Sequence, residues 1–128
     1  MPEISLKSVV LDTDDPAGLA RFYIDLLGWR IRWAEDDWVS IIGDGDVAIA
    51  FQLVLNYRPP TWPDGAVPQQ LHCDLRVHDL PAAAAYAESI GAQPVDGPTV
   101  GEGFRVFLDP SGHPFCLTVN EVVDSLSA

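Results

Sequence analysis

Positive charge is scarce in this sequence. Its 128 residues include 7 lysine and arginine side chains against 19 aspartate and glutamate side chains, which gives a formal net charge of −12. An acidic surface of this kind repels the phosphate backbone of nucleic acids, so we expect no nucleic-acid partner.

Cysteines and long apolar segments are scarce as well. Cys73 and Cys116 are too few for a disulfide scaffold. No apolar run approaches the roughly 20 residues that a membrane-spanning helix needs, so we expect no membrane partner. The segment from Met1 to Ile4 has neither the basic nor the apolar region of a signal peptide. A cytoplasmic location is therefore expected, with both thiols reduced.

The length and the hydrophobic content of 48% fit one globular domain, 1–128, with its own core. Residue patterns predict the same order of elements twice, a strand, a helix and three strands. The first repeat covers about 4–57, with strands at 4–11, 29–34, 38–42 and 47–56 and a helix between Asp15-Pro16 and Gly28. The second covers about 69–120, with strands at 70–78, 93–95, 104–108 and 113–120 and a helix at 82–90.

Between the repeats, the proline-rich segment 58–68 is unsuited to a helix or a central strand and is predicted to be a linker. The repeats are offset by about 64 residues, half the chain, which indicates an internal duplication. The predicted fold class is α+β, with two βαβββ repeats.

Each long strand has one large apolar face and one small or polar face. In 47–56 the apolar set is predicted to pack on the helices, and it consists of Val47, Ile49, Phe51, Leu53 and Leu55. The polar faces would either line a concave ligand groove or simply meet solvent. The repeat offset relates Ser8 to His72 and Gln52 to Cys116, all on the polar faces. A pseudo-twofold relation between the repeats would bring these four side chains towards one centre.

Several short motifs carry a resemblance to a known family. They are Asp15-Pro16, Phe22-Tyr23 and Leu26-Leu27-Gly28-Trp29 in the first half, and Leu71-His72-Cys73-Asp74-Leu75, Ile90-Gly91-Ala92 and Asp109-Pro110-Ser111-Gly112-His113 in the second. In this order the sequence resembles the vicinal oxygen chelate superfamily of glyoxalase I, bleomycin-resistance proteins and extradiol dioxygenases, nearest its glyoxalase-like subgroup. The resemblance implies a curved mixed sheet around a central groove, helices on the outer face, and a homodimer.

The resemblance also implies where a metal would bind. Metal-dependent relatives take one ligand from the first strand and one from the last strand of each half. Here those positions hold Ser8, Gln52, His72 and Cys116, of which only His72 is of the usual type. A set of His72, Gln52 and Cys116 could hold zinc but would hold magnesium, nickel or manganese poorly. We therefore predict no required cofactor, with a zinc-like divalent ion as the alternative.

Ligand-pocket residues are predicted on the same faces, namely Ser8, Gln52, His72, Asp74, Cys116 and Trp33. His72 is the candidate catalytic base or a simply hydrogen-bonded polar group. Asp74 would orient His72, bind a substrate cation, or pair with Arg76. Cys116 would be a nucleophile or a small buried side chain.

The chain has four tryptophans, which suit the stacking of flat organic ligands or ordinary core packing. Trp62, in the linker, could fold over the groove or contact a partner subunit.

The sequence leaves two functions open, because one fold can serve both a binding protein and an enzyme. The first is a small-molecule-binding protein with a degraded metal site, which would sequester an aromatic or amphipathic compound as bleomycin-resistance relatives do. The second is a lyase, isomerase or dioxygenase-like enzyme that acts on a small carbonyl or phenolic substrate through His72.

Overall fold

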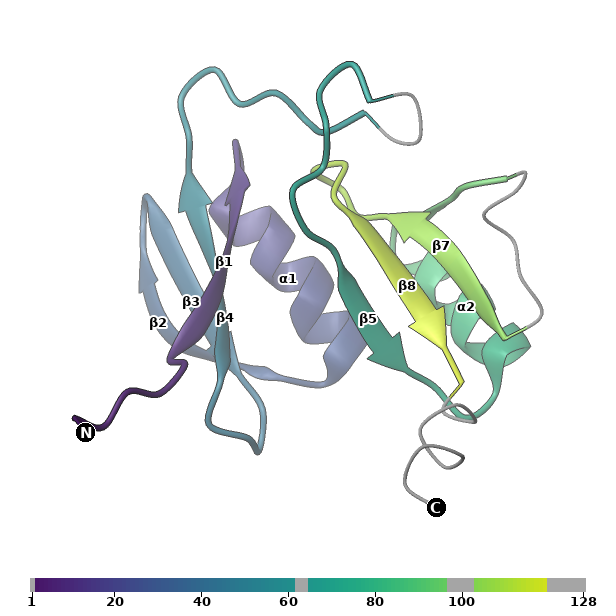
Figure 1. Ribbon diagram of the computed structural model, residues 1–128, viewed down its shortest axis with the longest axis horizontal. Helices are drawn as coiled ribbons and strands as arrows, with labels where there is room; N and C mark the ends of the chain where they lie inside the picture. Colours follow the sequence, from purple (N-terminus) through teal and green to yellow (C-terminus); the bar gives the residue numbers. More distant parts are fainter. Residues whose placement is uncertain (1, 62–64, 97–102, 120–128) are drawn as a thin grey trace. The chain divides into compact units, whose positions relative to one another are not determined.

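The protein is described by a computed structural model that covers residues 2–61, 65–96 and 103–119 (Figure 1). The chain divides into two compact units, Met1–Arg58 and Pro59–Ala128. Trp62, and the end of the predicted last strand at Asn120, lie outside the described residues. No helix among the described residues is long and apolar enough to cross a membrane.

The first unit contains one helix and a four-stranded sheet. Its elements are β1 (Ser8–Thr13), α1 (Pro16–Leu27), β2 (Arg30–Glu35), β3 (Trp38–Ile42) and β4 (Ala48–Leu53). The strand order is β1-β4-β3-β2, with β1 parallel to β4 and the other pairs antiparallel. The helix packs against β3 and β4, so one face of the sheet is covered by α1.

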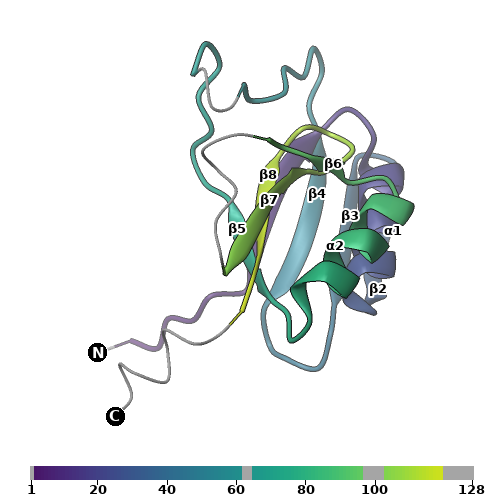
Figure 2. The ribbon, with the colours of Figure 1, turned by 90° about the vertical axis from the view of Figure 1, so that its right-hand side faces the viewer.

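The second unit repeats this arrangement. Its elements are β5 (Cys73–Arg76), α2 (Leu80–Ser89), β6 (Gln93–Pro94), β7 (Phe104–Leu108) and β8 (Pro114–Thr118). The strand order is β5-β8-β7-β6, and α2 lies along β7 and β8 (Figure 2). The predicted α+β class and the two βαβββ repeats are confirmed, and each repeat has its own four-stranded mixed sheet.

Both helices begin where the capping residues predict. The Asp15 carboxylate accepts a hydrogen bond of 3.0 Å from the Gly18 amide, and the Asp79 carboxylate accepts one of 3.0 Å from the Ala82 amide. Each bond satisfies an amide that the first helical turn leaves without a partner. The second helix starts at Leu80 rather than at 82, because Pro81 is tolerated within the first turn.

Several strands are shorter or shifted relative to the prediction. The first was predicted at 4–11 and lies at Ser8–Thr13, because its partner β4 begins opposite Ser8. The Ala48 amide at the start of β4 donates a hydrogen bond of 3.0 Å to the carbonyl of Lys7, the residue before β1. The prediction of 47–56 is wrong beyond Leu53, since Asn56 has a left-handed φ of 60° that ends the extended conformation. The strand predicted at 70–78 spans only Cys73–Arg76, so His72 lies just before it.

Stacked aromatic rings occupy the core of each unit. In the first, Tyr23 of α1 and Phe51 of β4 stack with ring centroids 5.6 Å apart. In the second, Phe107 and Phe115 stack at 5.7 Å. All four rings are buried. Phe51 therefore packs on the helix as predicted.

The predicted apolar face of 47–56 is wrong at its two ends. Val47 is 37% exposed and Leu55 is 80% exposed. Both residues lie outside β4, so the alternation that would turn their side chains towards α1 does not reach them.

Candidate functional site

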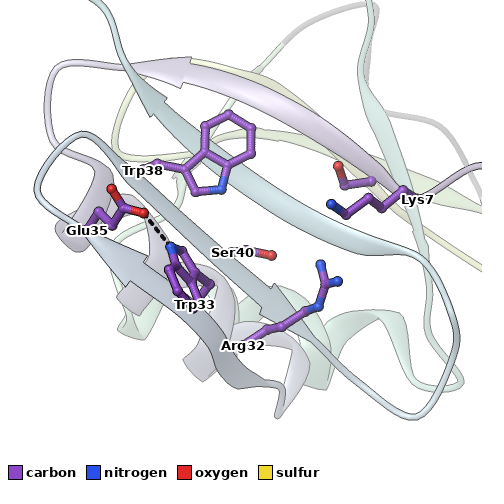
Figure 3. Close-up of a pocket in the computed structure, with 7 residues that line it drawn as sticks. Lys7, Arg32, Trp33, Glu35, Trp38 and Ser40 are labelled. Carbon is purple, nitrogen blue, oxygen red and sulfur yellow. Dashed lines mark hydrogen bonds between the residues drawn. The ribbon is translucent and has the colours of Figure 1, made fainter.

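A pocket of about 450 Å³ opens on the face of the first sheet opposite α1 (Figure 3). Seven residues line it, contributed by β1, β2, β3 and the residue before β1: Lys7, Ser8, Arg32, Trp33, Glu35, Trp38 and Ser40. The pocket lies entirely within one unit. Its size falls in the usual range for small-molecule sites, roughly 300–1,000 Å³.

A β-bulge in β2 shapes this pocket. The strand pairs Ile31 with Ile41 but Trp33 with Ser40, so the register shifts at Arg32. The extra residue lets Arg32 and Trp33, adjacent in sequence, both line the pocket. Ile31 instead lines a smaller pocket of about 150 Å³ beside α1.

The wall of the pocket carries two indole rings. The Trp33 Nε1 group donates a hydrogen bond of 2.6 Å to Glu35 Oε1, which favours one orientation of that ring. Trp33 remains 59% exposed, and Trp38 on β3 is partly exposed. A large exposed indole held in place offers a stacking surface for a flat molecule.

Polar groups occupy the rest of the pocket. Lys7 is the single lysine of the sequence, and Arg32 is one of its six arginines. Among the residues that the structure describes, no carboxylate forms an ion pair with either cation. Ser40 is 3% exposed, and its hydroxyl has no hydrogen-bond partner within the described part of the chain.

The resemblance implies two metal-ligand positions in the first unit, Ser8 and Gln52. These two residues lie at different levels along the strands of the sheet. Ser8 pairs with Ala48, while Gln52 pairs with Asp12 on one side and Trp38 on the other. Four residues of register separate Ser8 from Gln52, a distance of about 13 Å along the strands. Ser8 and Trp33 both line the pocket. The side chains of Ser8 and Gln52 are too far apart to hold one ion.

In the second unit, by contrast, three predicted residues come together. The His72 Nε2 atom lies 3.2 Å from Asp74 Oδ1, and Asp74 and Cys116 face each other across β5 and β8. One donor atom from each of the three residues lies within 4.8 Å of the others. Asp74 was predicted to orient His72, to bind a substrate cation or to pair with Arg76, and the structure contains the contact with His72. Within the first unit the separation of Ser8 and Gln52 is at odds with the predicted convergence of all four repeat-related positions, and the approach of either residue to His72 and Cys116 stays a prediction.

The environment of Cys116 keeps its thiol protonated. Burial raises the pKa of Cys116 to about 11, and the negative charge of Asp74 and a hydrogen bond to that carboxylate act in the same direction. Burial likewise raises the pKa of Cys73, together with the charges of Asp109 and Asp74. A thiol that stays protonated at neutral pH is a poor nucleophile, which disfavours that role for Cys116.

The chemistry of the second-unit cluster fits zinc. An imidazole nitrogen, a carboxylate oxygen and a thiolate sulfur are the donors that zinc takes in proteins, and three protein ligands are typical of catalytic zinc sites. His72 and Asp74 are, however, 45% and 61% exposed at their side chains. A bound ion would also have to displace a proton that Cys116 holds strongly.

Sequence reasoning missed four residues that line the first-unit pocket, namely Lys7, Arg32, Glu35 and Ser40, and considered Trp38 only as one of the four tryptophans. Alternation in 38–42 could have placed Ser40 on the same face as Trp38, since both oppose the buried Val39 and Ile41. Arg32 could not have been found in this way, because the bulge interrupts the alternation.

Comparison with known proteins gives a consistent fold assignment. The profile of the family described as "Glyoxalase-like domain" matches residues 8–118. No curated protein sequence matched the chain.

Many solved structures share the fold. A glyoxalase/bleomycin resistance protein/dioxygenase family enzyme from Burkholderia phytofirmans PsJN has a TM-score of 0.70 and 15% identity, over 91% of this chain and 98% of that one. The fosfomycin resistance protein FosX from Mesorhizobium loti has a TM-score of 0.69 and 14% identity, over 100% and 99%. TnmS3, an antibiotic binding protein from Streptomyces sp. CB03234, has a TM-score of 0.63 and 22% identity, over 94% and 98%.

Proposed function

The chain belongs to the glyoxalase-like domain family, and from that premise we propose that it binds and sequesters a small organic molecule with a flat aromatic or amphipathic body. The site of binding is the first-unit pocket. No metal ion takes part in this function.

The observation that carries the proposal is the pair of partly exposed indoles in a pocket of about 450 Å³. Trp33 lines this pocket and is 59% exposed, so much of its ring is accessible to a ligand. The hydrogen bond to Glu35 favours one orientation of the Trp33 ring in the ligand-free protein. Such preorganisation reduces the entropy lost on binding.

The residues at the implied metal positions support binding over metal chemistry. Ser8 and Gln52 are neutral oxygen donors, and they lie about 13 Å apart along the sheet. Relatives of the same fold include a protein named as antibiotic binding and one named for fosfomycin resistance. Small-molecule capture is thus a role that this fold already supports.

We expect Trp33→Ala to weaken aromatic binding by roughly tenfold or more, since stacking on an indole contributes about 1 kcal/mol beyond the apolar area that it buries. Isothermal titration calorimetry with two planar aromatics, 2-naphthoate and 2-naphthamide, measures this directly. Tyr86→Ala is the matched control, because Tyr86 is an aromatic of similar exposure on α2 and lies outside the pocket. Equal affinities for the wild type and Trp33→Ala would contradict the assignment of the pocket.

The cluster of His72, Asp74 and Cys116 favours a second candidate function, that of a zinc enzyme. These three residues would hold the ion, which when bound would polarise a carbonyl or phenolic oxygen of the substrate. Besides holding the ion, His72 and Asp74 would bind and orient that substrate at the exposed end of β5.

We expect protein purified without chelator to contain zinc well below one equivalent, because the Cys116 proton and the exposure of the other donors oppose metal binding. Elemental mass spectrometry measures the metal content, with His72→Ala as the test variant and the exposed His78→Ala as the control. One equivalent of zinc that is lost in His72→Ala and kept in His78→Ala would favour the enzyme instead.

A further inference from the structure

We infer that the ligand of the first-unit pocket is a planar organic anion, whose carboxylate or similar oxyanion lies between Lys7 and Arg32. The inference rests on the proposed function and names the chemical class of the ligand. It depends on the charges of the pocket, on one buried hydroxyl and on the position of Glu35.

Two cationic side chains, Lys7 and Arg32, line the same pocket. No carboxylate in the described residues forms an ion pair with either of them. Figure 3 shows both cationic groups on the same side of the pocket. Like charges on one side of a pocket repel each other, and an oxyanion between them removes that repulsion and gains charge-assisted hydrogen bonds.

Ser40 provides a second, independent observation. Its hydroxyl lies in the pocket wall between the indole rings and the cations (Figure 3), and it has no partner among the described residues. A hydroxyl that is only 3% exposed loses its water without gaining a hydrogen bond, which costs free energy. An oxyanion held by Lys7 and Arg32 would accept the hydrogen bond that this hydroxyl lacks.

Glu35 sets the direction of the ligand. Its carboxylate is on the side of the pocket that holds Trp38, and it accepts the Trp33 Nε1 hydrogen bond (Figure 3). A second negative charge on that side would be repelled. The pocket is thus polarised, with an aromatic wall and a carboxylate at one side and two cations at the other, so the flat body of the ligand lies on the indoles.

Two probes of the same shape test this assignment. The acid 2-naphthoate and its amide, 2-naphthamide, have the same ring system and differ in one group, a carboxylate in the first and an uncharged amide in the second. We expect calorimetry to give roughly tenfold tighter binding of the acid, the usual effect of a hydrogen bond to a charged group. Lys7→Gln and Arg32→Gln should each reduce this preference and leave the affinity for the amide unchanged. Arg21→Gln, which removes a charge from α1 in the same unit, should retain it.

The outcomes distinguish the inference of an anionic ligand from the proposed binding of an aromatic molecule. Equal affinity for acid and amide in the wild-type protein overturns the anionic ligand and leaves aromatic binding in place. Absence of binding by both probes counts against the inference and the proposed function together. A preference for the acid that survives in Lys7→Gln and Arg32→Gln also overturns the inference.

Ser40→Ala adds a readout that does not depend on the cations. Without a ligand, the variant should melt at a higher temperature than the wild type, because it removes an unsatisfied buried hydroxyl. It should nevertheless bind 2-naphthoate more weakly and 2-naphthamide equally well. A lower melting temperature would mean that the hydroxyl is satisfied within the protein, and unchanged affinity for the acid would remove it from the site.

Discussion

Phe51→Ala is expected to lower the free energy of unfolding by about 3–5 kcal/mol, the range for truncating a buried phenylalanine to alanine. The side chain is fully buried on β4 and stacks on Tyr23 of α1. Its removal leaves a cavity between the helix and the sheet and takes away the stacking contact as well. Urea unfolding followed by circular dichroism measures the change.

Leu55→Ala is the control for this prediction. Leu55 lies two residues beyond the end of β4 and is 80% exposed. We expect its truncation to change the free energy of unfolding by less than about 0.5 kcal/mol. A loss of similar size for both variants would mean that the segment after β4 packs on the core, contrary to its exposure.

Alkylation of Cys116 by iodoacetamide is expected to be about one hundredfold slower in the folded protein than in the urea-unfolded chain at pH 8. The thiolate is the reactive form, and the pKa of Cys116 rises from an ordinary value of 9.0 to about 11 on folding. The fraction of thiolate falls by about ten for each unit of pKa. Mass spectrometry of the peptide that contains Cys116 gives the rate at this site alone.

The pH dependence has a definite sign. Below about pH 9 the thiol is protonated in both states, so folding and protonation are not linked. Between about pH 9 and pH 11 the unfolded chain loses this proton first, and Cys116 therefore lowers the stability of the folded state as the pH rises. The alkylation rate of the folded protein should keep rising across this window, whereas that of the unfolded chain levels off.

Asp74→Asn separates the contributions to this pKa. The variant removes the charge that, together with the hydrogen bond, adds to the effect of burial. Cys116 should then react faster than in the wild type but still more slowly than in the unfolded chain. Glu88→Gln, an exposed carboxyl group on α2, serves as the control and should leave the rate unchanged. An unchanged rate in Asp74→Asn would leave burial as the sole cause.

The order of elements could be predicted because its signals are local. Asp15 and Asp79 each cap the helix that follows, and their spacing reveals the repeat. The extent of the strands could not be predicted, since it depends on which segments pair. Residues 4–7 have a strand-like composition but lie outside β1, because β4 starts opposite Ser8.

The candidate site was only partly predictable for a related reason. Trp33 was predicted as a pocket residue from its type, and it lines the first-unit pocket together with Ser8. The presence of Arg32 beside it depends on a shift of register between Ile31 and Trp33, which no pattern within β2 reveals. The missing partner of Ser40 is likewise a property of the assembled sheet.

The pairing of the first and last strands within each repeat has a consequence for biosynthesis. Neither sheet can be completed until its last strand has left the ribosome, since β1 needs β4 and β5 needs β8. The first unit has all its strands outside the ribosome once Leu53 has emerged, before β5 has emerged. Domains generally fold as units in the order of their synthesis, at about 5–20 residues per second. The nascent chain can therefore form the aromatic pocket before the strand that carries Asp74 has left the ribosome.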